Sequence, residues 1–370
     1  MVLNYKYRIY PENTNIIDKL IFEYNQAYNI SISLIQTEGR KMYDKGISSK
    51  DIFNELYRQV RFELNKREIY DKSALTQDAL RSAYNTLFTN IKQKKPFNLH
   101  FKDSSSLEGS FTFRTDSLVN KIFRSINFKT NIHRDIPDNY RILGSKIKRE
   151  GDKYYIIYTI TDETVHIKEQ TTDILGIDSN QGNYTFSNGY RIDFVKSIYP
   201  ELEAKRVKAQ KTLSSKKKKS KNRKKKQKLL FNISRKIKHR RKDDIQKRVT
   251  KILNETTAKA YAIEKLNIKK MTTKTTNTTK EPKTNKGLTK NMLHIAHAEF
   301  FACLDYKSVL KDRFVVKVNP AYTSQTCSRC GAIKQKTLSE REHVCSCGLK
   351  IDRDLNAAIN IYRLGLSLCS

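Results

Sequence analysis

Acidic residues are scarce in this sequence. Only 38 Asp and Glu stand against 73 Lys and Arg in 370 residues, which gives a formal net charge of +35. A compact protein with that surplus repels itself, and a polyanionic partner relieves the repulsion. Nucleic acid is the first candidate for that partner, and an anionic membrane is the second. The length allows two or three domains with a substantial core.

Long apolar runs are missing as well. No run approaches the roughly 20 residues of a membrane-spanning helix. The opening "MVLNYKYRIYPENTN" has no apolar segment of the kind found in signal peptides. The sequence therefore argues against a membrane partner, and it predicts a cytoplasmic, nucleoid-associated protein that binds nucleic acid.

The cysteines lack the distribution of a disulfide framework. Four of the six lie in two close pairs: Cys327 with Cys330, and Cys345 with Cys347. Such clustering is typical of metal ligation in a reducing compartment. Four thiolates at this spacing predict a structural Zn²⁺ site, and buried free thiols are the alternative. The second pair is one residue shorter than the usual C-x-x-C, so His343 could replace one ligand. Cys303 and Cys369 are expected to be ordinary thiols.

Periodicity divides the first half of the chain into a strand, a helical unit and further strands. Residues 4–10 alternate between polar and apolar side chains, as strands do, whereas residues 13–94 repeat apolar side chains at helical spacing. Further strands are expected at 97–101, 110–114 and 141–161. The last segment predicts a hairpin with Gly151 and Asp152 at its turn. We expect these strands to form a small β-barrel that carries the helical unit as an insertion.

A basic run at 201–250 is the most charged part of the chain, with 22 Lys and Arg against 4 Asp and Glu. It lies between two apolar, strand-like segments, so a solvated tail is the weaker interpretation. Its apolar residues are expected to pack as one stripe on a sheet: Leu229, Leu230, Ile233 and Ile237. The lysines would then make sequence-independent, salt-sensitive contacts to a phosphate backbone. Residues 271–290 predict a mobile loop, and a helix is expected at 291–306.

Three acids lie at the ends of apolar segments or at a helix start. Asp178 follows "ILGI", Glu264 follows "YAI", and Asp354 precedes "LNAAINIYRL". Carboxylates that converge from separate elements can hold two Mg²⁺ ions about 3.5–4 Å apart for phosphodiester hydrolysis. The plainer interpretations are solvated strand ends and, for Asp354, a helix N-cap. Spacing alone does not choose between Asp352 and Asp354.

Three motifs together resemble one family. "GIDSNQGN", "AIEKLNIKKM" and "TSQTCSRCG…CSCGLKIDRDLNAAINI" occur in this order, and they resemble the transposon-encoded TnpB proteins, relatives of the type V CRISPR nucleases. The resemblance implies an α/β multidomain fold: a RuvC-like, RNase H-type nuclease domain interrupted by a zinc ribbon, and a wedge-like β-barrel carrying a helical recognition lobe. It also implies an RNA-guided DNA endonuclease that needs Mg²⁺ and cuts double-stranded target DNA beside a short motif. The guide RNA is transcribed from the element's end, with one protein per RNA; the oligomeric state is left open.

Residue by residue, the resemblance implies that Asp178, Glu264 and Asp354 are the catalytic Mg²⁺ ligands. It implies that the four clustered cysteines bind zinc and that 271–290 is a lid over the active site. The first motif departs from the family's G-I-D-x-G, because Asn180 replaces that glycine and Gly182 comes two residues later.

The expected domain boundaries follow from the same motifs. They are, in chain order, the β-barrel at 1–12 and 95–170, the helical lobe at 13–94, the nuclease domain at 171–320 and 349–370, and the zinc ribbon at 321–348. Alternatives to a nuclease are an RNA-guided repressor without cleavage, a transposase or its accessory protein, and a zinc-ribbon regulator. The presence of all three acids favours the nuclease.

Overall fold

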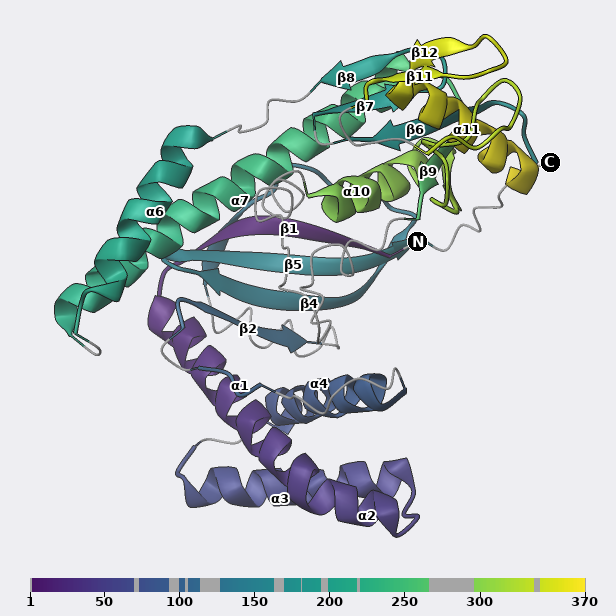
Figure 1. The fold of residues 1–370 in the computed structure, drawn as a ribbon. Helices are drawn as coiled ribbons and strands as arrows, with labels where there is room; N and C mark the ends of the chain where they lie inside the picture. Colours follow the sequence, from purple (N-terminus) through teal and green to yellow (C-terminus); the bar gives the residue numbers. More distant parts are fainter. Residues whose placement is uncertain are drawn as a thin grey trace, which may run out of the picture. The chain divides into compact units, whose positions relative to one another are not determined.

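A computed structural model describes most of the chain, which divides into two compact units at residues 1–164 and 165–370. The described residues are 2–69, 73–92, 100–103, 106–113, 127–162, 170–180, 182–193, 199–217, 220–265, 296–335 and 340–369. Each unit contains a five-stranded sheet and its own helices (Figure 1). None of the helices within these ranges is long and apolar enough to span a membrane.

The sheet of the first unit is antiparallel throughout, with strand order β2-β4-β5-β1-β3. The strands are β1 (Val2–Pro11), β2 (Glu108–Phe113), β3 (Phe128–Asn131), β4 (Tyr140–Glu150) and β5 (Lys153–Asp162). The predicted hairpin is confirmed as β4 and β5, and Gly151 at its turn has a φ of 67°. The prediction of a strand at 97–101 is wrong for residues 100–101, the part that the structure describes, because they are not in a strand. Closure of the sheet into a barrel stays a prediction.

The helical unit predicted after β1 is confirmed. Its members are α1 (Thr14–Leu34), the π-helical η1 (Ile35–Gly39), α2 (Arg40–Asp44), α3 (Ser49–Lys66) and α4 (Ser73–Lys92). Asn13 caps α1 by accepting a hydrogen bond from the Asn15 amide. The α1 residues Ile17, Leu20 and Ile21 are buried in one core with the inward row of β1, Tyr5, Tyr7 and Ile9.

The second unit is built on a mixed sheet with strand order β10-β9-β6-β7-β8. Its strands are β6 (Ile174–Ser179), β7 (Asn183–Phe186), β8 (Arg191–Asp193), β9 (Ala260–Glu264) and β10 (Phe314–Val318). β6, β9 and β10 run parallel, whereas β6, β7 and β8 run antiparallel. Two short strands, β11 (Glu342–Val344) and β12 (Lys350–Asp352), pair beside this sheet in the cysteine region.

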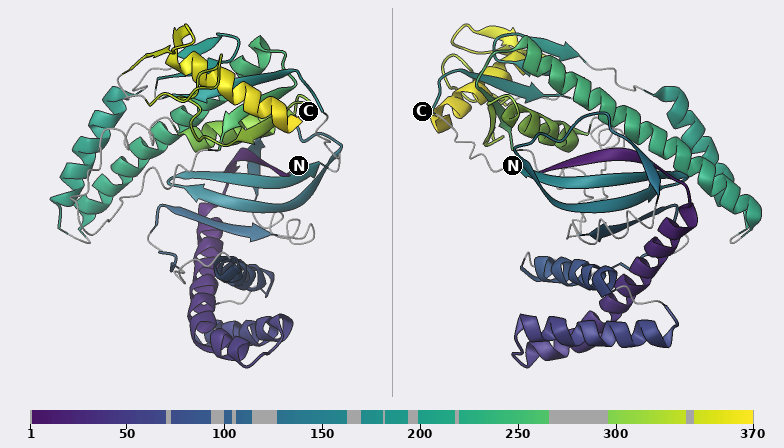
Figure 2. Two further views of the ribbon diagram at one scale, coloured as in Figure 1. Left: turned by 45° about the vertical axis from the view of Figure 1, so that its right-hand side comes forward. Right: turned by 180° about the vertical axis from the view of Figure 1, so that it is seen from behind.

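Helices cover both faces of the second sheet. One face packs on α7 (Lys221–Glu255) and α10 (His297–Val309), where Phe300 stacks on Tyr184 with ring centroids 4.0 Å apart. The other face packs on α11 (Arg353–Cys369). Figure 2 shows α11 lying along the strands. Because side chains alternate between the faces of a strand, the residues that meet α11 are every second residue of β6 and β9.

The basic run forms two helices that pack against each other, α6 (Pro200–Ser214) and α7. The predicted apolar stripe lies too early in α7: Leu229 is 45% exposed, and among the predicted residues only Ile237 is buried. The residues that pack in the core are Ile245, Val249, Ile252 and Leu253. Hence the last part of α7 covers the sheet and the most basic part lies against α6. The helix expected at 291–306 begins at His297, and the loop at 271–290 lies outside the described residues.

Candidate active site and zinc centre

The strand register places Asp178 and Glu264 side by side. β6 and β9 are parallel, and Ile177 lies opposite Ile263, so the acids that follow occupy equivalent positions on neighbouring strands. Both acids continue the row of residues that faces α11, two residues beyond Gly176 and Ala262 respectively. The parallel pairing thus brings together two residues that are 86 positions apart in the sequence.

Asp354 reaches the same region from the first turn of α11. It is 5% exposed, and its charge acts on Asp178. The N-cap of this helix is Asp352, whose carboxylate accepts hydrogen bonds from the amides of Asp354 and Leu355 at 2.9 and 3.0 Å. Asp354 is therefore not the capping residue; its Oδ1 accepts hydrogen bonds from the Arg353 guanidinium at 3.3 Å.

Burial dominates the electrostatics of the two strand-borne acids, and repulsion from the other acids adds to it at Asp178. Burial, together with the charges of Glu264 and Asp354, raises the pKa of Asp178 to about 7. Burial also raises the pKa of Glu264. The nearby cation is Arg353, which forms an ion pair with Asp354 at 3.3 Å. Arg191 is a second guanidinium on which the charge of Asp354 acts. Carboxylate oxygens are the hard donors that divalent cations such as Mg²⁺ prefer, but among the described residues only the four cysteines lie close enough together to form a metal-binding group as they stand.

Two neutral side chains hold the strand-borne acids. Asn180 donates a hydrogen bond to Asp178 Oδ2 at 2.8 Å, and the hydroxyl of Thr323 donates to Glu264 Oε1. Asn180 is also tied to the β6–β7 turn, where its amide bonds to the Asn183 carbonyl, and its φ is not left-handed. The turn therefore does not require the family's glycine at this position. In the sequence, Asn180 stands out only because it replaces the glycine of the family's G-I-D-x-G motif. No feature of the sequence indicates that Thr323 contacts Glu264.

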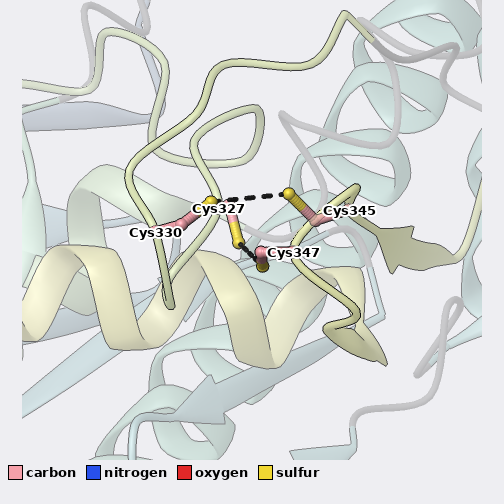
Figure 3. A group of neighbouring side chains, drawn as sticks. All are labelled: Cys327, Cys330, Cys345 and Cys347. Carbon is pink, nitrogen blue, oxygen red and sulfur yellow. Dashed lines mark hydrogen bonds between the residues drawn. The ribbon is translucent and has the colours of Figure 1, made fainter.

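The four predicted zinc ligands converge. All four sulfur atoms lie within 4.8 Å of one another, and Figure 3 shows them pointing toward one centre from two loops. The Cys327–Cys347 and Cys330–Cys345 sulfur separations are 3.7 and 3.6 Å. These match the edge of a tetrahedron of about 3.8 Å that a zinc–sulfur bond of roughly 2.3 Å requires. The short C-x-C pair therefore supplies both of its thiols, and His343 is not among the converging ligands.

Two parts of the chain match known families. Residues 156–275 match the family described as "Probable transposase" (OrfB_IS605), and residues 297–361 match the "Cas12f1-like, TNB domain". Together these matches span half of the chain. A "TnpB-like protein" of Acanthamoeba polyphaga mimivirus is 30% identical over 203 residues, which are 55% of this chain and 35% of the relative. The chain is therefore similar to TnpB-like proteins.

Two relatives that align over longer stretches carry nuclease names. A "Putative RNA-guided DNA endonuclease" of Streptomyces pristinaespiralis is 26% identical over 78% of this chain and 69% of the relative. A "CRISPR-associated endodeoxyribonuclease Cas12f2" of a Micrarchaeota archaeon is 27% identical over 88% of this chain and 57% of the relative. The protein in a solved Cas12f1–sgRNA–target DNA complex aligns with a TM-score of 0.57 at 16% identity, over 94% of this chain and 82% of that one. The last likeness shows a shared fold.

Proposed function

We propose that this protein is a member of the TnpB family and an RNA-guided endonuclease that cuts double-stranded DNA beside a short target-adjacent motif. The observation that carries the proposal is the arrangement of Asp178, Glu264 and Asp354, three carboxylates delivered to one region by β6, β9 and α11. A repressor that only binds DNA would not need Glu264 and Asp354 near Asp178, where their charges raise its pKa. The nuclease names of the relatives support the same activity.

The second unit is proposed to be a RuvC-like domain of the RNase H type. In support, its sheet has three antiparallel strands followed by two parallel ones, and α11 packs against the face that carries the acids. The cysteine segment at 321–348 would then be an inserted ribbon between 171–320 and 349–370. In the first unit, a barrel at 1–12 and 95–170 carrying a recognition lobe at 13–94 remains a proposal.

Asp178, Glu264 and Asp354 would hold two catalytic Mg²⁺ ions. When bound, Mg²⁺ supplies charge stabilisation for the attacking and leaving oxygens of the phosphodiester. The protein's own contribution is to fix the carboxylates. Asn180 and Thr323 orient two of them through hydrogen bonds, and the cap at Asp352 sets the start of the helix that carries the third.

The proposed partners are a guide RNA, transcribed from the element's end, and the target DNA. The basic surface of α6 and α7 suits a phosphate backbone, because backbone contacts bind nucleic acid without reading its sequence. A guide RNA would then provide the sequence specificity by base pairing.

The test is to purify the protein from cells that carry its flanking DNA and to sequence the RNA that copurifies. The same preparation is assayed for Mg²⁺-dependent cleavage of a DNA library that matches the RNA. Asp178→Asn is compared with Asp193→Asn, whose carboxylate is exposed at the end of β8. We expect one discrete RNA, cleavage by the wild type and by Asp193→Asn, and none by Asp178→Asn. Binding without cleavage by the wild type would favour a guided repressor, and the lack of any defined RNA would contradict the proposal.

A further inference from the structure

The segment between β10 and the first cysteine pair forms a compact turn that touches both the acids' sheet and α11. Its residue Thr323 is 5% exposed, and its hydroxyl donates a hydrogen bond to Glu264 Oε1. The backbone of the same region is fixed to the strand, because the Lys265 amide bonds to the Val318 carbonyl at 2.9 Å. Thr323 is therefore the side chain of this turn that reaches the end of β9.

Two asparagines of α11 hold this turn in place. Asn360 donates to the carbonyl oxygens of Thr323 and Thr326 at 2.9 and 2.7 Å. Asn356 donates to the Thr326 carbonyl at 2.8 Å and accepts from the Ser328 amide at 2.9 Å. The asparagines are four residues apart, so they share one face of the helix. Both are buried, where an unpaired amide would be costly.

These contacts join three parts of the unit through one turn. Ser328 lies inside the first cysteine pair, and Asn356 lies two residues after Asp354. At the other end of the turn, Thr323 touches Glu264. The backbone of Tyr322 is left-handed, with a φ of 62°. A tyrosine adopts that conformation only when its surroundings impose it, so the shape of the turn is set by the contacts on both sides of it.

We propose that Thr323 is a positioning residue for Glu264, held by Asn360, through which the cysteine ribbon and α11 fix the second acid as well as the third. The inference rests on the proposed role of the three acids as metal ligands. Side chains that hydrogen-bond to a ligand commonly change metal affinity by about 10–100-fold when removed. Valine has the shape of threonine without the hydroxyl, and serine keeps the hydroxyl. Comparing the two substitutions therefore separates the hydrogen bond that orients Glu264 from the packing of the Thr323 side chain.

The experiment titrates the purified full-length protein with Mn²⁺ as a probe and follows free Mn²⁺ by electron paramagnetic resonance. Thr323→Val, Thr323→Ser and Glu264→Gln are compared with Thr250→Val, which removes an exposed hydroxyl on α7. Zinc content and thermal unfolding are measured on each protein. We expect Thr323→Val to weaken Mn²⁺ binding at least 10-fold. Thr323→Ser should stay within about 3-fold of the wild type, and zinc content should not change.

Each other outcome has a definite meaning. If Glu264→Gln loses Mn²⁺ and Thr323→Val does not, the positioning role is overturned while the proposed active site stands. If Glu264→Gln binds Mn²⁺ like the wild type, Glu264 is not a ligand, and the proposed site and this inference both fail. If Thr323→Ser is as weak as Thr323→Val, or if Thr323→Val releases zinc, the residue serves packing of the turn and the positioning role is overturned. Should Thr323→Val not fold, Thr323→Ala takes its place and is compared with Thr323→Ser, from which it differs only by the hydroxyl: at least 10-fold weaker Mn²⁺ binding by the alanine variant supports the proposal, and equal binding by the two variants overturns it.

Discussion

Gly176 of β6 and Ala358 of α11 approach so closely that a methyl group on Gly176 would lie 2.2 Å from the Ala358 carbonyl oxygen. The Tyr362 amide nitrogen would be 2.5 Å away, so the obstacle is helix backbone and cannot rotate aside. A second glycine, Gly365, meets the Ala262 side chain of β9 in the same way. The two glycines let α11 lie directly on the strands that carry Asp178 and Glu264.

Gly176→Ala is therefore expected to push α11 away from β6. The free energy of unfolding should fall by about 1–3 kcal/mol, the usual cost of overpacking, and cleavage should fall with it. Chemical denaturation and the cleavage assay measure the two effects. Gly182→Ala is the matched control, since a methyl group there meets nothing within 4 Å. Equal stability of the two variants would contradict the close-packing argument.

Asp352 and Asp354 are expected to separate stability from activity. Asp352→Ala removes the cap of α11 and should cost about 1 kcal/mol of unfolding free energy, while cleavage stays within a few-fold of wild type. Asp354→Asn leaves the cap intact and should abolish cleavage with little change in stability, because the relief of repulsion on Asp178 offsets the lost ion pair with Arg353. Denaturation and cleavage on the same preparations test both. If Asp352→Ala abolished cleavage and Asp354→Asn only lowered stability, the assignment of Asp352 as the cap and Asp354 as the catalytic residue would be wrong.

Removing zinc ligands should impair the nuclease even though all three acids remain. Cys327→Ser with Cys330→Ser is expected to abolish zinc binding, and loss of the metal should unfold the ribbon locally, because metal binding contributes folding free energy. Cleavage should fall because the turn next to the ribbon touches α11 and Glu264. Metal analysis and the cleavage assay are the measurements, with Cys303→Ala as control. Full cleavage without zinc would show that the ribbon does not support the site.

Glu150 predicts an acid-sensitive contact in the first unit. Burial alone would raise the pKa of this carboxyl, but hydrogen bonds and charges from Lys148 and Lys6, both at 2.8 Å, outweigh it and lower the pKa to about 2. A carboxyl whose pKa is lowered by folding stabilises the folded state at pH values above its ordinary pKa of 4.5. That stabilisation disappears as the pH falls from 4.5 toward 2. Glu150→Gln should therefore cost about 1–3 kcal/mol at pH 7 and progressively less below pH 4.5.

Denaturation curves of wild type and Glu150→Gln between pH 7 and pH 3 check this expectation. Glu108→Gln removes an exposed carboxylate on the neighbouring strand and serves as the control. A stability difference that does not shrink as the pH falls would show that the lysine contacts do not depend on the charge of Glu150.

The exposed lysines of α7 should set the salt dependence of nucleic-acid binding. Lys224→Gln with Lys225→Gln is expected to reduce the slope of log K against log salt by about 0.9 for each duplex phosphate that these lysines neutralise in the wild type. Lys247→Gln is the control, because that ammonium is already paired with Asp243 at 2.8 Å on the same helix. Fluorescence anisotropy over a range of salt concentrations measures the slopes. Equal slopes for the double variant and the wild type would exclude this surface of α7 from phosphate binding.

The sequence was informative where a local pattern decides the structure. Short apolar runs predicted the strands before Asp178 and Glu264, and the spacing of the cysteines predicted their convergence. Spacing alone could not separate Asp352 from Asp354, because either can cap a helix, and only the resemblance to TnpB proteins favoured Asp354 as the catalytic residue. The choice depends on where the first helical turn begins, and the structure places that at Arg353.

Contacts between distant segments explain what the sequence could not supply. Thr323 meets a carboxylate 59 residues earlier in the chain, and nothing in "TSQTC" indicates that contact. The apolar stripe of α7 was placed too early for a similar reason. Apolar residues recur along much of this helix, and the sheet covers only the last part of it. Which of them are buried depends on the packing partner, so periodicity alone could not decide.

The two basic helices also divide the proposed nuclease into complementary halves. Asp178 comes before α6, whereas Glu264 and Asp354 come after α7, so a chain break between the helices leaves neither fragment with all three carboxylates. The two fragments would associate through the pairing of β6 with β9 and the packing of α11 on Gly176. If the two fragments were expressed as separate polypeptides, cleavage would require their association, so cleavage activity would measure whether the two fragments bind each other.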